Sequence, residues 1–406
     1  MSNLNIGIVG LGARGAGLLK LIARMKDIDI SWLCDLYTDR VETAIKVVNK
    51  IKGYEPKGTS DYKNIIDDKN IDAILILSSW ESHTKIALEA MAKNIYVGLE
   101  VGGAYDIQEC WDLVDAYEKH KTPCMMLENC CYGKYELMVL NMVRKGMFGT
   151  VVHCAGGYHH DLRKEIAFGK ENRHYRLQNY LTRNCENYPT HELGPISKIL
   201  NINRGNKMNS LVSVSSKANG MREYIKENKS GDEDLVNAEF TQGDIVITTI
   251  KCENGETIVL TLDTTLPRHY SRGFTVRGTK AMYQEEANIL FLDKKHQIYD
   301  FYSRPLWNNG KKYARKYAHT IWKQYRKEGI RGGHGGMDYL VLRAFFESVH
   351  AKGETPIDVY DTVSWMCITA LSEKSIKEEI VVEVPDFTRG KWKNREEVPQ
   401  GKYALD

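Results

Sequence analysis

The first thirty-five residues contain the pattern that most restricts how this chain can fold. An apolar run at residues 6–9 leads into Gly10-Leu11-Gly12-Ala13-Arg14-Gly15. An amphipathic stretch follows from residue 16 to about residue 26, and a second apolar run ends at Asp35, twenty residues after Gly15. Glycine permits the tight turn that such a change from strand to helix requires. The pattern therefore predicts a strand, a helix and a second, parallel strand.

Each glycine of this turn has a separate physical reason. Gly10 permits the tight turn after the strand, Gly12 lets the backbone approach a pyrophosphate, and Gly15 lets the helix pack closely on the sheet. Unpaired N–H groups at the start of the helix then bind the pyrophosphate. Asp35 can accept hydrogen bonds from both hydroxyls of a ribose, and its charge would repel a 2′-phosphate. We therefore expect NAD to bind here in preference to NADP.

Length and composition narrow the class of protein further. A chain of 406 residues is too long for one compact core, so two domains are expected. Its 56 basic and 53 acidic residues leave a net charge of +3 with no biased block, so neither nucleic acid nor a membrane is an expected partner. No run approaches the roughly eighteen apolar residues of a membrane span. The nine cysteines include no C-x-x-C pair, and residues 1–5 show no export signal, which predicts reduced thiols in a cytoplasmic chain.

Strands and helices alternate through the first third of the chain. The predicted elements are helices at 38–51, 84–93 and 107–120 and strands at 72–77, 94–99 and 123–127. Such alternation predicts a doubly wound parallel sheet, a Rossmann fold, which we assign to an NAD-binding domain of residues 1–130. Ligands of these sheets lie beyond the carboxyl ends of the strands. The side chains expected at that edge are Trp80, His83, Glu100, Val101, Glu128 and Asn129.

The pattern changes after residue 130. A helix at about 135–145 and a strand at 150–157 are followed, from about 208 to 301, by short runs in which apolar and polar residues alternate. The predicted strands of that region are 212–216, 244–252, 257–264, 273–278 and 281–285. We expect residues 131–406 to form a substrate-binding α+β domain with an open, mainly antiparallel sheet, one face of which is covered.

Three stretches near the C-terminus complete the pattern. Helices are expected at 337–350 and at about 359–379. Residues 307–331 are basic with interleaved Tyr and Trp, and we interpret them as a solvated or substrate-covering loop, because the rest of the chain is not basic enough for a nucleic-acid surface. His334-Gly335-Gly336-Met337-Asp338 opens a helix whose N–H groups could face a sugar or an anion, or it could be a flexible hinge.

A Rossmann half followed by an open antiparallel sheet resembles the Gfo/Idh/MocA oxidoreductases, and the resemblance covers essentially the whole chain. Those dehydrogenases usually carry an E-K-P motif, whose lysine works in proton transfer to the substrate alcohol. Here the equivalent stretch is Glu100-Val101-Gly102, without the lysine. Their later D-x-G-x-H stretch reads Asn187-Tyr188-Pro189-Thr190-His191. Both departures argue against a simple dehydrogenase.

With these departures, the sequence resembles one branch of the superfamily, the NAD-dependent glycoside hydrolases of family 109, which are known as α-N-acetylgalactosaminidases. The matching motifs are L-G-A-R-G at 11–15, Trp80 to His83, Glu100-Val101, Glu128-Asn129, G-G-Y at 156–158, H-D-L-R at 160–163, Y-R-L at 175–177, Arg183-Asn184, Y-P-T-H at 188–191, L-G-P at 193–195 and Tyr270. The resemblance implies that the protein hydrolyses N-acetylgalactosaminides, and the α linkage is expected. The substrate would be a small glycoside or the end of a glycan. One departure remains, because Glu192 stands where the family usually has glycine and could alter substrate choice.

The resemblance also implies which residues bind each ligand. Beside Gly10 and Gly12 of the turn, NAD contacts are implied for Arg14, Gly15, Asp35, Trp80, His83, Glu100, Val101, Asn129 and Tyr188. Contacts with the sugar are implied for Tyr158, Arg176, Tyr188, Pro189, Thr190, His191 and Tyr270.

Hydrolysis is not a redox reaction, so a bound NAD requires a temporary oxidation. Hydride leaves C3 of the sugar, and the resulting ketone makes the C2 hydrogen acidic. The C1 substituent is then eliminated, water adds, and the hydride returns to C3. NAD is expected to be tightly bound and not consumed. This cycle needs a base for the C3 hydroxyl, a second base at C2 and an acid at the leaving oxygen.

Several residues are candidates for these proton transfers. His191 is our candidate for the C3 base, because a neutral imidazole accepts a proton near neutral pH. A histidine at this position could instead cap the helix that starts near Glu192. Glu128 could act as the acid or fix a sugar hydroxyl. The candidates at C2, provided that a cation such as Arg176 lowers a phenol pKa, are Tyr158, Tyr188 and Tyr270.

Other interpretations stay open. A conventional sugar or polyol dehydrogenase would show net hydride transfer, and a non-catalytic NAD-bound sensor would tolerate loss of His191. A two-carboxylate glycosidase could use Asp161 and Glu192, but it leaves the dinucleotide site unexplained. No metal site is expected at His159-His160-Asp161, because neighbouring side chains of a strand point to opposite faces. A homo-oligomer, a dimer or larger, is expected because exposed sheet faces of this fold class often pair.

Overall fold

A six-stranded parallel sheet forms the first part of the protein, as the alternating pattern predicts. The computed structural model describes residues 3–296, 302–395 and 401–405. The strands are β1 (Leu4–Val9), β2 (Ile28–Cys34), β3 (Lys57–Thr59), β4 (Ala73–Ile76), β5 (Tyr96–Leu99) and β6 (Cys124–Met126). Their order is β3-β2-β1-β4-β5-β6. The order reverses between β1 and β4, and such sheets bind ligands at that switch point.

The helices of this first part cover both faces of the sheet. They are α1 (Ala13–Ile22), α2 (Thr38–Lys52), α3 (Lys63–Ile66), α4 (Trp80–Met91) and α5 (Ile107–His120). α5 has the predicted bounds, and its start is fixed by Asp106, which accepts a hydrogen bond from the backbone N–H of Glu109. α1 and α4 begin before the predicted residues 16 and 84. Trp80 and His83 therefore lie in the first turn of α4 and not in the loop before it.

The second part contains an eight-stranded sheet, which is mainly antiparallel as predicted. Its strands are β7 (Val151–His159), β8 (Met208–Ser215), β9 (Ile245–Cys252), β10 (Thr257–Asp263), β11 (Thr275–Gly278), β12 (Ala281–Gln284), β13 (Ile289–Leu292) and β14 (Val382–Glu383), in the order β13-β12-β11-β7-β10-β9-β8-β14. Among its described strands, only β7 and β10 pair in parallel. Buried and exposed residues alternate along β9. β13 and β14 were not predicted, because β13 is apolar throughout and β14 has only two residues, so neither shows an alternating pattern.

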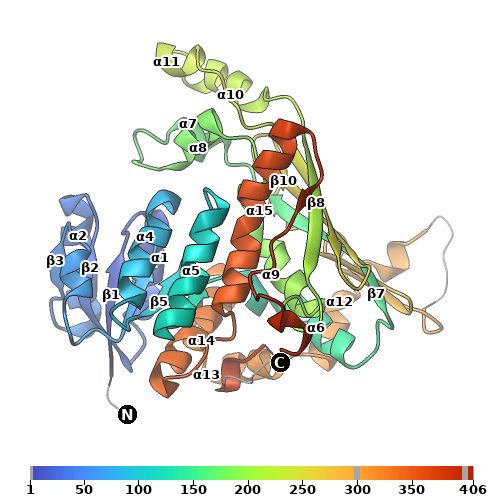
Figure 1. Cartoon of the computed structure of the whole chain (residues 1–406), viewed down its shortest axis with the longest axis horizontal. Helices are drawn as coiled ribbons and strands as arrows, with labels where there is room; N and C mark the ends of the chain where they lie inside the picture. Colours follow the sequence, from blue (N-terminus) through green and yellow to red (C-terminus); the bar gives the residue numbers. More distant parts are fainter. Residues whose placement is uncertain (1–2, 297–301, 396–400, 406) are drawn as a thin grey trace.

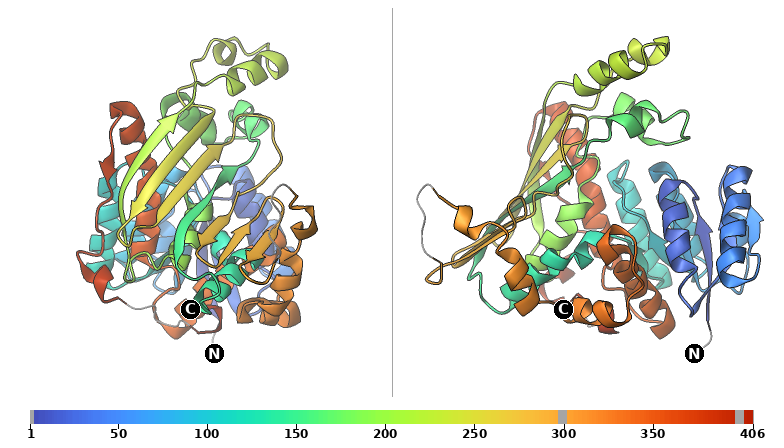
Figure 2. Two further views of the ribbon diagram at one scale, coloured as in Figure 1. Left: turned by 90° about the vertical axis from the view of Figure 1, so that its right-hand side faces the viewer. Right: turned by 180° about the vertical axis from the view of Figure 1, so that it is seen from behind.

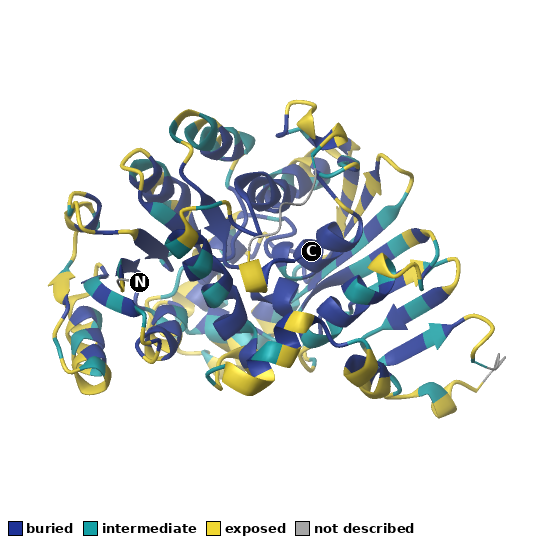
Figure 3. Cartoon of the chain, turned by 90° about the horizontal axis from the view of Figure 1, so that it is seen from below, coloured by how far each residue is buried: buried dark blue, intermediate teal, exposed yellow. Residues whose placement is uncertain are grey.

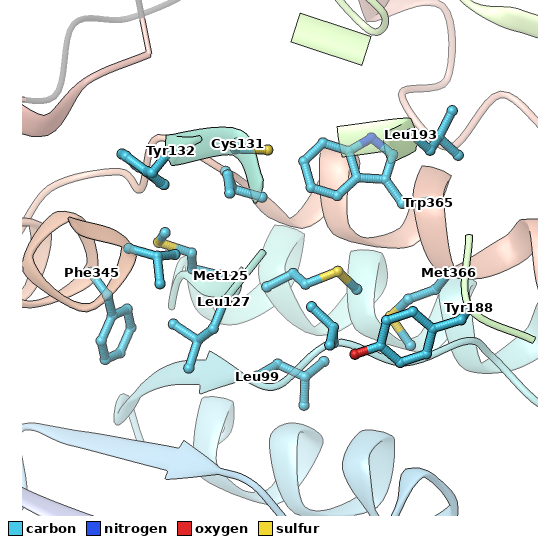
Figure 4. Packing of buried hydrophobic residues seen from close by; sticks show 14 of the residues in the cluster. Leu99, Met125, Leu127, Cys131, Tyr132, Tyr188, Leu193, Phe345, Trp365 and Met366 are labelled. Atoms are coloured by element: carbon cyan, nitrogen blue, oxygen red, sulfur yellow. The ribbon is translucent and has the colours of Figure 1, made fainter. Parts of the chain in front are cut away.

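Long helices lie between the two sheets (Figure 1). The helices and turns of the second part are η1 (Asn129–Tyr132), α6 (Lys134–Arg144), α7 (Arg163–Ala167), α8 (Arg176–Thr182), α9 (Thr190–Ile199), α10 (Gly220–Asn228), α11 (Glu233–Val236), α12 (Gly310–Lys316), α13 (Thr320–Glu328), α14 (Met337–Ala351) and α15 (Val359–Glu378). Of these, α15 contacts both β6 and β8. Figure 4 shows the resulting core, in which Leu99 and Met125 of the first sheet lie near Trp365 and Met366 of α15. The boundary between residues 130 and 131 stays a prediction.

The prediction of a loop at residues 307–331 is wrong. This stretch forms α12 and α13, and Tyr313, Ile321 and Trp322 are buried. The indole Nε1 of Trp322 donates a hydrogen bond of 2.9 Å to the carbonyl of Tyr132. The aromatic residues between the basic ones are therefore the packed face of two short helices, and the lysines and arginines cover the solvent side. The stretch packs against η1 through Trp322 and is not a substrate-covering loop.

One face of the eight-stranded sheet carries no helix among the described residues. Figure 2 shows its strands facing the viewer without a covering layer. Val214 and Ile247, which pair across β8 and β9, are exposed there. Buried residues concentrate instead between the two sheets (Figure 3). In the described part of the chain, no helix is long and apolar enough to cross a membrane.

Candidate active site

The glycine turn has the geometry that the sequence predicts for Gly10 and Gly15. Gly10 has a φ of +95°, and a Cβ there would lie 2.4 Å from the carbonyl carbon of Leu77. A Cβ on Gly15 would lie 2.1 Å from the carbonyl oxygen of Gly10, so the helix packs directly on the turn. A Cβ on Gly12 would meet only Arg40, at 3.6 Å. The backbone at Gly12 is therefore open, as close approach of a ligand requires.

The start of α1 fits a pyrophosphate. No side chain of the described residues caps it, and its first turn contains no acidic residue. Its leading N–H groups therefore keep their affinity for an anion. By contrast, the N-terminus of α5 is capped by Asp106. The residues present thus fit a dinucleotide whose phosphates rest on α1.

Asp35 holds the adjacent loop in place. Its Oδ2 accepts a hydrogen bond of 2.7 Å from the N–H of Leu11, and its Oδ1 accepts one of 3.0 Å from the N–H of Tyr37. Arg40 Nη1 lies 3.7 Å from Oδ2. The carboxylate is therefore fixed at the end of β2, beside the glycine turn, where the ribose of a bound NAD is expected.

A buried network joins the glycine turn to the second part of the chain. Arg14 contacts Glu100 at 3.0 Å and forms two hydrogen bonds, of 2.9 and 3.0 Å, with Asp338. Asn129 Nδ2 donates to Asp338 at 2.7 Å, and His334 Nδ1 lies 2.9 Å from the same carboxylate. Burial opposes ionisation of Asp338, but His334 and Arg14 hold its pKa well below its usual range. The glycine-rich stretch before α14 therefore binds to the edge of the first sheet formed by the carboxyl ends of its strands. We call this edge, where NAD is expected, the cofactor edge.

The sequence singled out His334 and Asp338 but did not assign them a partner. Their signal was a histidine four residues before an aspartate at a helix start. Nothing in the sequence showed that Arg14, more than three hundred residues away, would complete the group. That the N–H groups of this stretch face a ligand, or that the stretch is a hinge, stays a prediction.

Trp80, His83 and Val101 lie together at the ends of β4 and β5. Trp80 Nε1 donates a hydrogen bond of 3.1 Å to the carbonyl of Val101. His83 is buried, with Nε2 3.0 Å from the carbonyl of Ser78. Burial lowers the pKa of His83 to about 4, so the ring is neutral and donates to that carbonyl. All three residues shape the edge where a nicotinamide is expected.

An aromatic cluster extends from Trp80 into the second part of the chain. The rings of Tyr158 and Tyr188 stack, with centroids 4.2 Å apart, and Tyr188 lies 5.9 Å from Trp80. The guanidinium carbon of Arg176 lies 5.3 Å from the Trp80 ring and 5.2 Å from the Tyr188 ring. Tyr270 reaches the Tyr158 ring from the loop after β10, at 6.4 Å. The structure thus brings these predicted sugar-site residues to the predicted cofactor edge.

His191 completes the cluster and pairs with Glu128. Its ring lies 5.4 Å from Tyr158, and its Nδ1 lies 2.9 and 3.1 Å from the two carboxylate oxygens of Glu128. Glu128 follows β6 and is fully buried, while His191 lies in the first turn of α9. Burial would raise the pKa of Glu128, but the charge of His191 and its hydrogen bonds lower it. The alternative that His191 caps α9 is wrong, because its side chain binds Glu128 and the helix has no side-chain cap.

Arg176 does lower the pKa of the neighbouring phenols Tyr158 and Tyr188, but burial outweighs it, so the condition set for a phenol base is not met. Burial raises the pKa of Tyr158 to about 12, and the opposing effect of Arg176 is smaller. Burial also raises the pKa of Tyr188 and of Tyr270 above the usual range. All three phenols are therefore protonated near neutral pH, and none is a base unless its own proton leaves at the same time.

Other side chains near the cluster do not face it. Glu192 is fully buried, and its Oε1 lies 3.4 Å from Nε of Arg272. Asp161 forms an ion pair with Arg163 at 2.7 Å. The two-carboxylate glycosidase is therefore excluded for this pair, because Glu192 cannot reach a glycosidic bond. Thr190 is also buried, so its side chain offers little surface to a sugar.

The predicted opposition of His159 and His160 is confirmed. His160 turns to Tyr158, whereas the ring of His159 lies on the other face, beside Gly273. Among the described residues, the one group of three metal-ligating side chains with ligand atoms within 4.8 Å is Glu128, Cys130 and His191. Two of those residues already form the pair described above.

The glycine turn, the cofactor edge and the His191–Glu128 pair together define a Rossmann-type enzyme of the Gfo/Idh/MocA class. Residues 4–128 match the family described as an oxidoreductase family with an NAD-binding Rossmann fold. Residues 132–394 match the C-terminal domain of glycosyl hydrolase 109. The chain belongs to glycosyl hydrolase family 109.

Curated relatives and solved structures agree with this assignment. The chain is 38% identical to a glycosyl hydrolase family 109 protein of Stenotrophomonas maltophilia, over 98% of this chain and 93% of that one. It is 34% identical to an alpha-N-acetylgalactosaminidase of Tannerella forsythia, over 97% and 88% of the two chains. A levoglucosan dehydrogenase in complex with NADH and levoglucosan superposes with a TM-score of 0.69 at 18% identity, covering 95% of this chain and all of that one. At that identity the structural likeness shows the fold alone.

Proposed function

We propose that this protein is an NAD-dependent glycosidase that hydrolyses N-acetylgalactosaminides, with the α linkage as its substrate. The observation that carries the proposal is the His191–Glu128 pair, which stands at the cofactor edge of a Rossmann sheet where Val101 replaces a lysine. A base is therefore present without the proton-transfer lysine of ordinary dehydrogenases. The family membership and the name of the Tannerella forsythia relative support the same conclusion.

The His191–Glu128 pair performs the first proton transfer in this proposal. Nδ1 of His191 donates to the Glu128 carboxylate, which leaves Nε2 to accept the proton of the C3 hydroxyl. The buried carboxylate stabilises the imidazolium that forms. When bound, NAD supplies a reversible hydride acceptor for C3. Its residues are those proposed from the sequence, with Gly12 and the start of α1 for the phosphates and Asp35 for the ribose.

The aromatic cluster and Arg176 are the proposed sugar site. Apolar faces of Tyr158 and Tyr188 can cover the C–H groups of a pyranose, and Arg176 can donate to its oxygens. Within the described residues, Nη1 of Arg176 is buried without a hydrogen-bond partner. A buried guanidinium N–H without an acceptor is costly, so a substrate oxygen is its natural partner. Tyr270, about half exposed, closes the rim of this site.

Retention of NAD through many turnovers is also part of the proposal. The segment between α7 and α8 reaches the first sheet, where Arg173 forms hydrogen bonds of 3.0 and 2.8 Å with Asp39. Arg40 donates to the carbonyl of Asn172 at 3.1 Å. In Figure 1 this segment lies above the first sheet. A contact of this kind across the adenosine end of the site would slow release of the dinucleotide.

The function is tested by following C2 of the product. The purified protein is incubated with p-nitrophenyl N-acetyl-α-galactosaminide in deuterated water, without added NAD. We expect nitrophenol release and deuterium at C2 of the released sugar. Accumulation of oxidised sugar and reduced coenzyme in equal amounts would identify a dehydrogenase, and release without label would exclude the oxidative route. His191→Ala should abolish turnover with NAD still bound, which also separates an enzyme from a sensor.

We further propose a homo-oligomer that forms through the uncovered face of the eight-stranded sheet. Val214 and Ile247 are exposed on that face, and a second copy would bury them. Val214→Lys combined with Ile247→Lys should reduce the mass measured by light scattering. An unchanged mass in the double variant, or a monomeric wild-type protein, would contradict this interface.

The nine buried, unpaired cysteines support a reducing, cytoplasmic location.

A further inference from the structure

A histidine that the proposed reaction has not yet used lies against Tyr158. Tyr158 Oη and His160 Nδ1 are 2.8 Å apart. The two residues are two positions apart at the end of β7, so their side chains share one face of the strand. The rings meet edge to face, with centroids 5.5 Å apart. This hydrogen bond connects the proposed sugar site to the half-buried ring of His160.

The surroundings keep His160 neutral. Burial and the positive charges of Arg176 and His191 lower its pKa, and the carboxylates of Glu165 and Asp161 oppose them only in part. The ring of Tyr270 packs edge to face on its other side, at 5.1 Å. A neutral imidazole next to a protonated phenol accepts the phenol proton at Nδ1 and carries its own proton on Nε2. His160 is therefore the acceptor of this hydrogen bond.

The phenol of Tyr158 needs such an acceptor if it is to act at C2. Its pKa is about 12 because it is buried, so it holds its proton throughout the neutral range. A protonated phenol can accept a proton from carbon only if it gives up its own proton in the same step. In the described structure, the side chain hydrogen-bonded to this hydroxyl is His160.

We propose that His160 is a positioning residue that works through Tyr158 and receives its proton when C2 of the sugar is deprotonated. In this step the C2–H bond breaks and its electron pair enters the C2–C3 bond of an enolate. The proton binds Oη of Tyr158, the earlier Oη proton moves to Nδ1 of His160, and an imidazolium forms. Charge is conserved, because one anion and one cation appear together. The reverse transfer returns the proton to C2 after water has added.

This inference rests on the proposed function, and it assigns the C2 base to Tyr158 over Tyr188 and Tyr270. Tyr188 stacks face to face on Tyr158, and Tyr270 touches the ring of His160 by its edge. Only the Tyr158 hydroxyl has an imidazole nitrogen within hydrogen-bonding distance among the described contacts of the three phenols. The same geometry explains why a histidine stands two residues after this tyrosine.

The test separates proton transfer from simple positioning. Asn at residue 160 places an amide oxygen close to the position of Nδ1, so His160→Asn keeps an acceptor for the phenol but has no basic nitrogen. His159→Asn is the matched control, because that side chain lies on the opposite face of the same strand. Hydrolysis and deuterium exchange at C2 are followed from acid to alkaline pH, and NAD content is measured for every variant.

We expect His160→Asn to keep its NAD and to lose about 10²- to 10³-fold in C2 exchange, as removal of a general base does. The acidic limb of the wild-type pH profile should become shallower, because His160 no longer contributes to it. Imidazole added to His160→Ala should restore part of the exchange. His159→Asn should behave like wild type. Exchange within threefold of wild type in His160→Asn, or no rescue by imidazole, would overturn the relay.

The two proposals fail in different ways. If wild-type protein released sugar without label at C2, the oxidative glycosidase itself would be wrong. If wild type incorporated label and His160→Asn did so equally fast, only the assignment of His160 would fall. Should His160→Asn fold poorly, His160→Gln with imidazole rescue of His160→Ala still decides the question.

Discussion

The pair formed by His191 and Glu128 gives the sharpest test of the site. Glu128→Gln keeps the size of the side chain and removes its charge. In the wild type the carboxylate is fully buried and lies 2.9 and 3.1 Å from His191 Nδ1. It also accepts a hydrogen bond of 3.0 Å from the N–H of Cys130. The amide oxygen can still accept from His191, so the ring should keep its place, but it no longer stabilises an imidazolium.

The size of the effect follows from the lost charge. A hydrogen bond to a charged group contributes about 1.5 to 3 kcal/mol. If that amount is lost only in the transition state, kcat falls about 10- to 150-fold, since about 1.4 kcal/mol corresponds to a factor of ten. KM should change little, because the amide still holds His191 in place and the side chains of the proposed sugar site are unchanged. The fold should be retained, because the buried volume is unchanged.

Initial rates on the nitrophenyl glycoside give kcat and KM, and thermal unfolding checks the fold. Glu192→Gln is the matched control. It also replaces a fully buried carboxyl next to His191 in sequence, but burial raises the pKa of Glu192, and its Oε1 lies 3.4 Å from Arg272 and not beside His191. We expect the control to stay within about twofold of wild type, as a substitution outside the reacting groups does. A Glu128→Gln variant as active as the control would refute the role given to the pair.

Three further predictions follow from the structure. Gly12→Ala should lose NAD but fold normally, because its Cβ meets only Arg40, at 3.6 Å. Gly15→Ala should unfold at a lower temperature, because its Cβ would lie 2.1 Å from the Gly10 carbonyl oxygen. Equal Tm values for the two variants would contradict this expectation. Burial raises the pKa of Glu186 to about 8 from 4.5, so stability should be lost as pH rises from 5 to 9, by roughly 3 to 5 kcal/mol. Glu186→Gln should remove most of that loss in urea unfolding at the two pH values, and an unchanged loss would assign it elsewhere. Arg173→Ala should release NAD about two- to fivefold faster in a dilution experiment, without a change in the initial hydrolysis rate. The effect is small because the ion pair with Asp39 is exposed. Unchanged release would show that this segment does not retain the dinucleotide.

The sequence alone determined the elements whose cause is local. The turn from Gly10 to Gly15 is short, and each glycine answers to its immediate neighbours, so its geometry could be predicted. α5 was predicted to the residue, because Asp106 caps it from the preceding position. The alternation of strands and helices likewise predicted the parallel first sheet, and the period-two pattern predicted the mainly antiparallel second sheet; the order of the strands came from the structure.

Only the tertiary structure decided which side chains meet. Asp338 pairs with Arg14 across a sequence separation of 324 residues, and no local pattern encodes such a contact. Residues 307–331 read as a loop because their charges mask the apolar positions, and these became visible only against their packing partner. The sequence made a phenol base conditional on a cation such as Arg176, but the pKa of Tyr158 is set mainly by burial, which is a property of the assembled fold. Steric constraints between neighbouring residues depend on the local sequence and can be predicted from it. Desolvation of a side chain and pairing between distant residues arise only when the chain has folded.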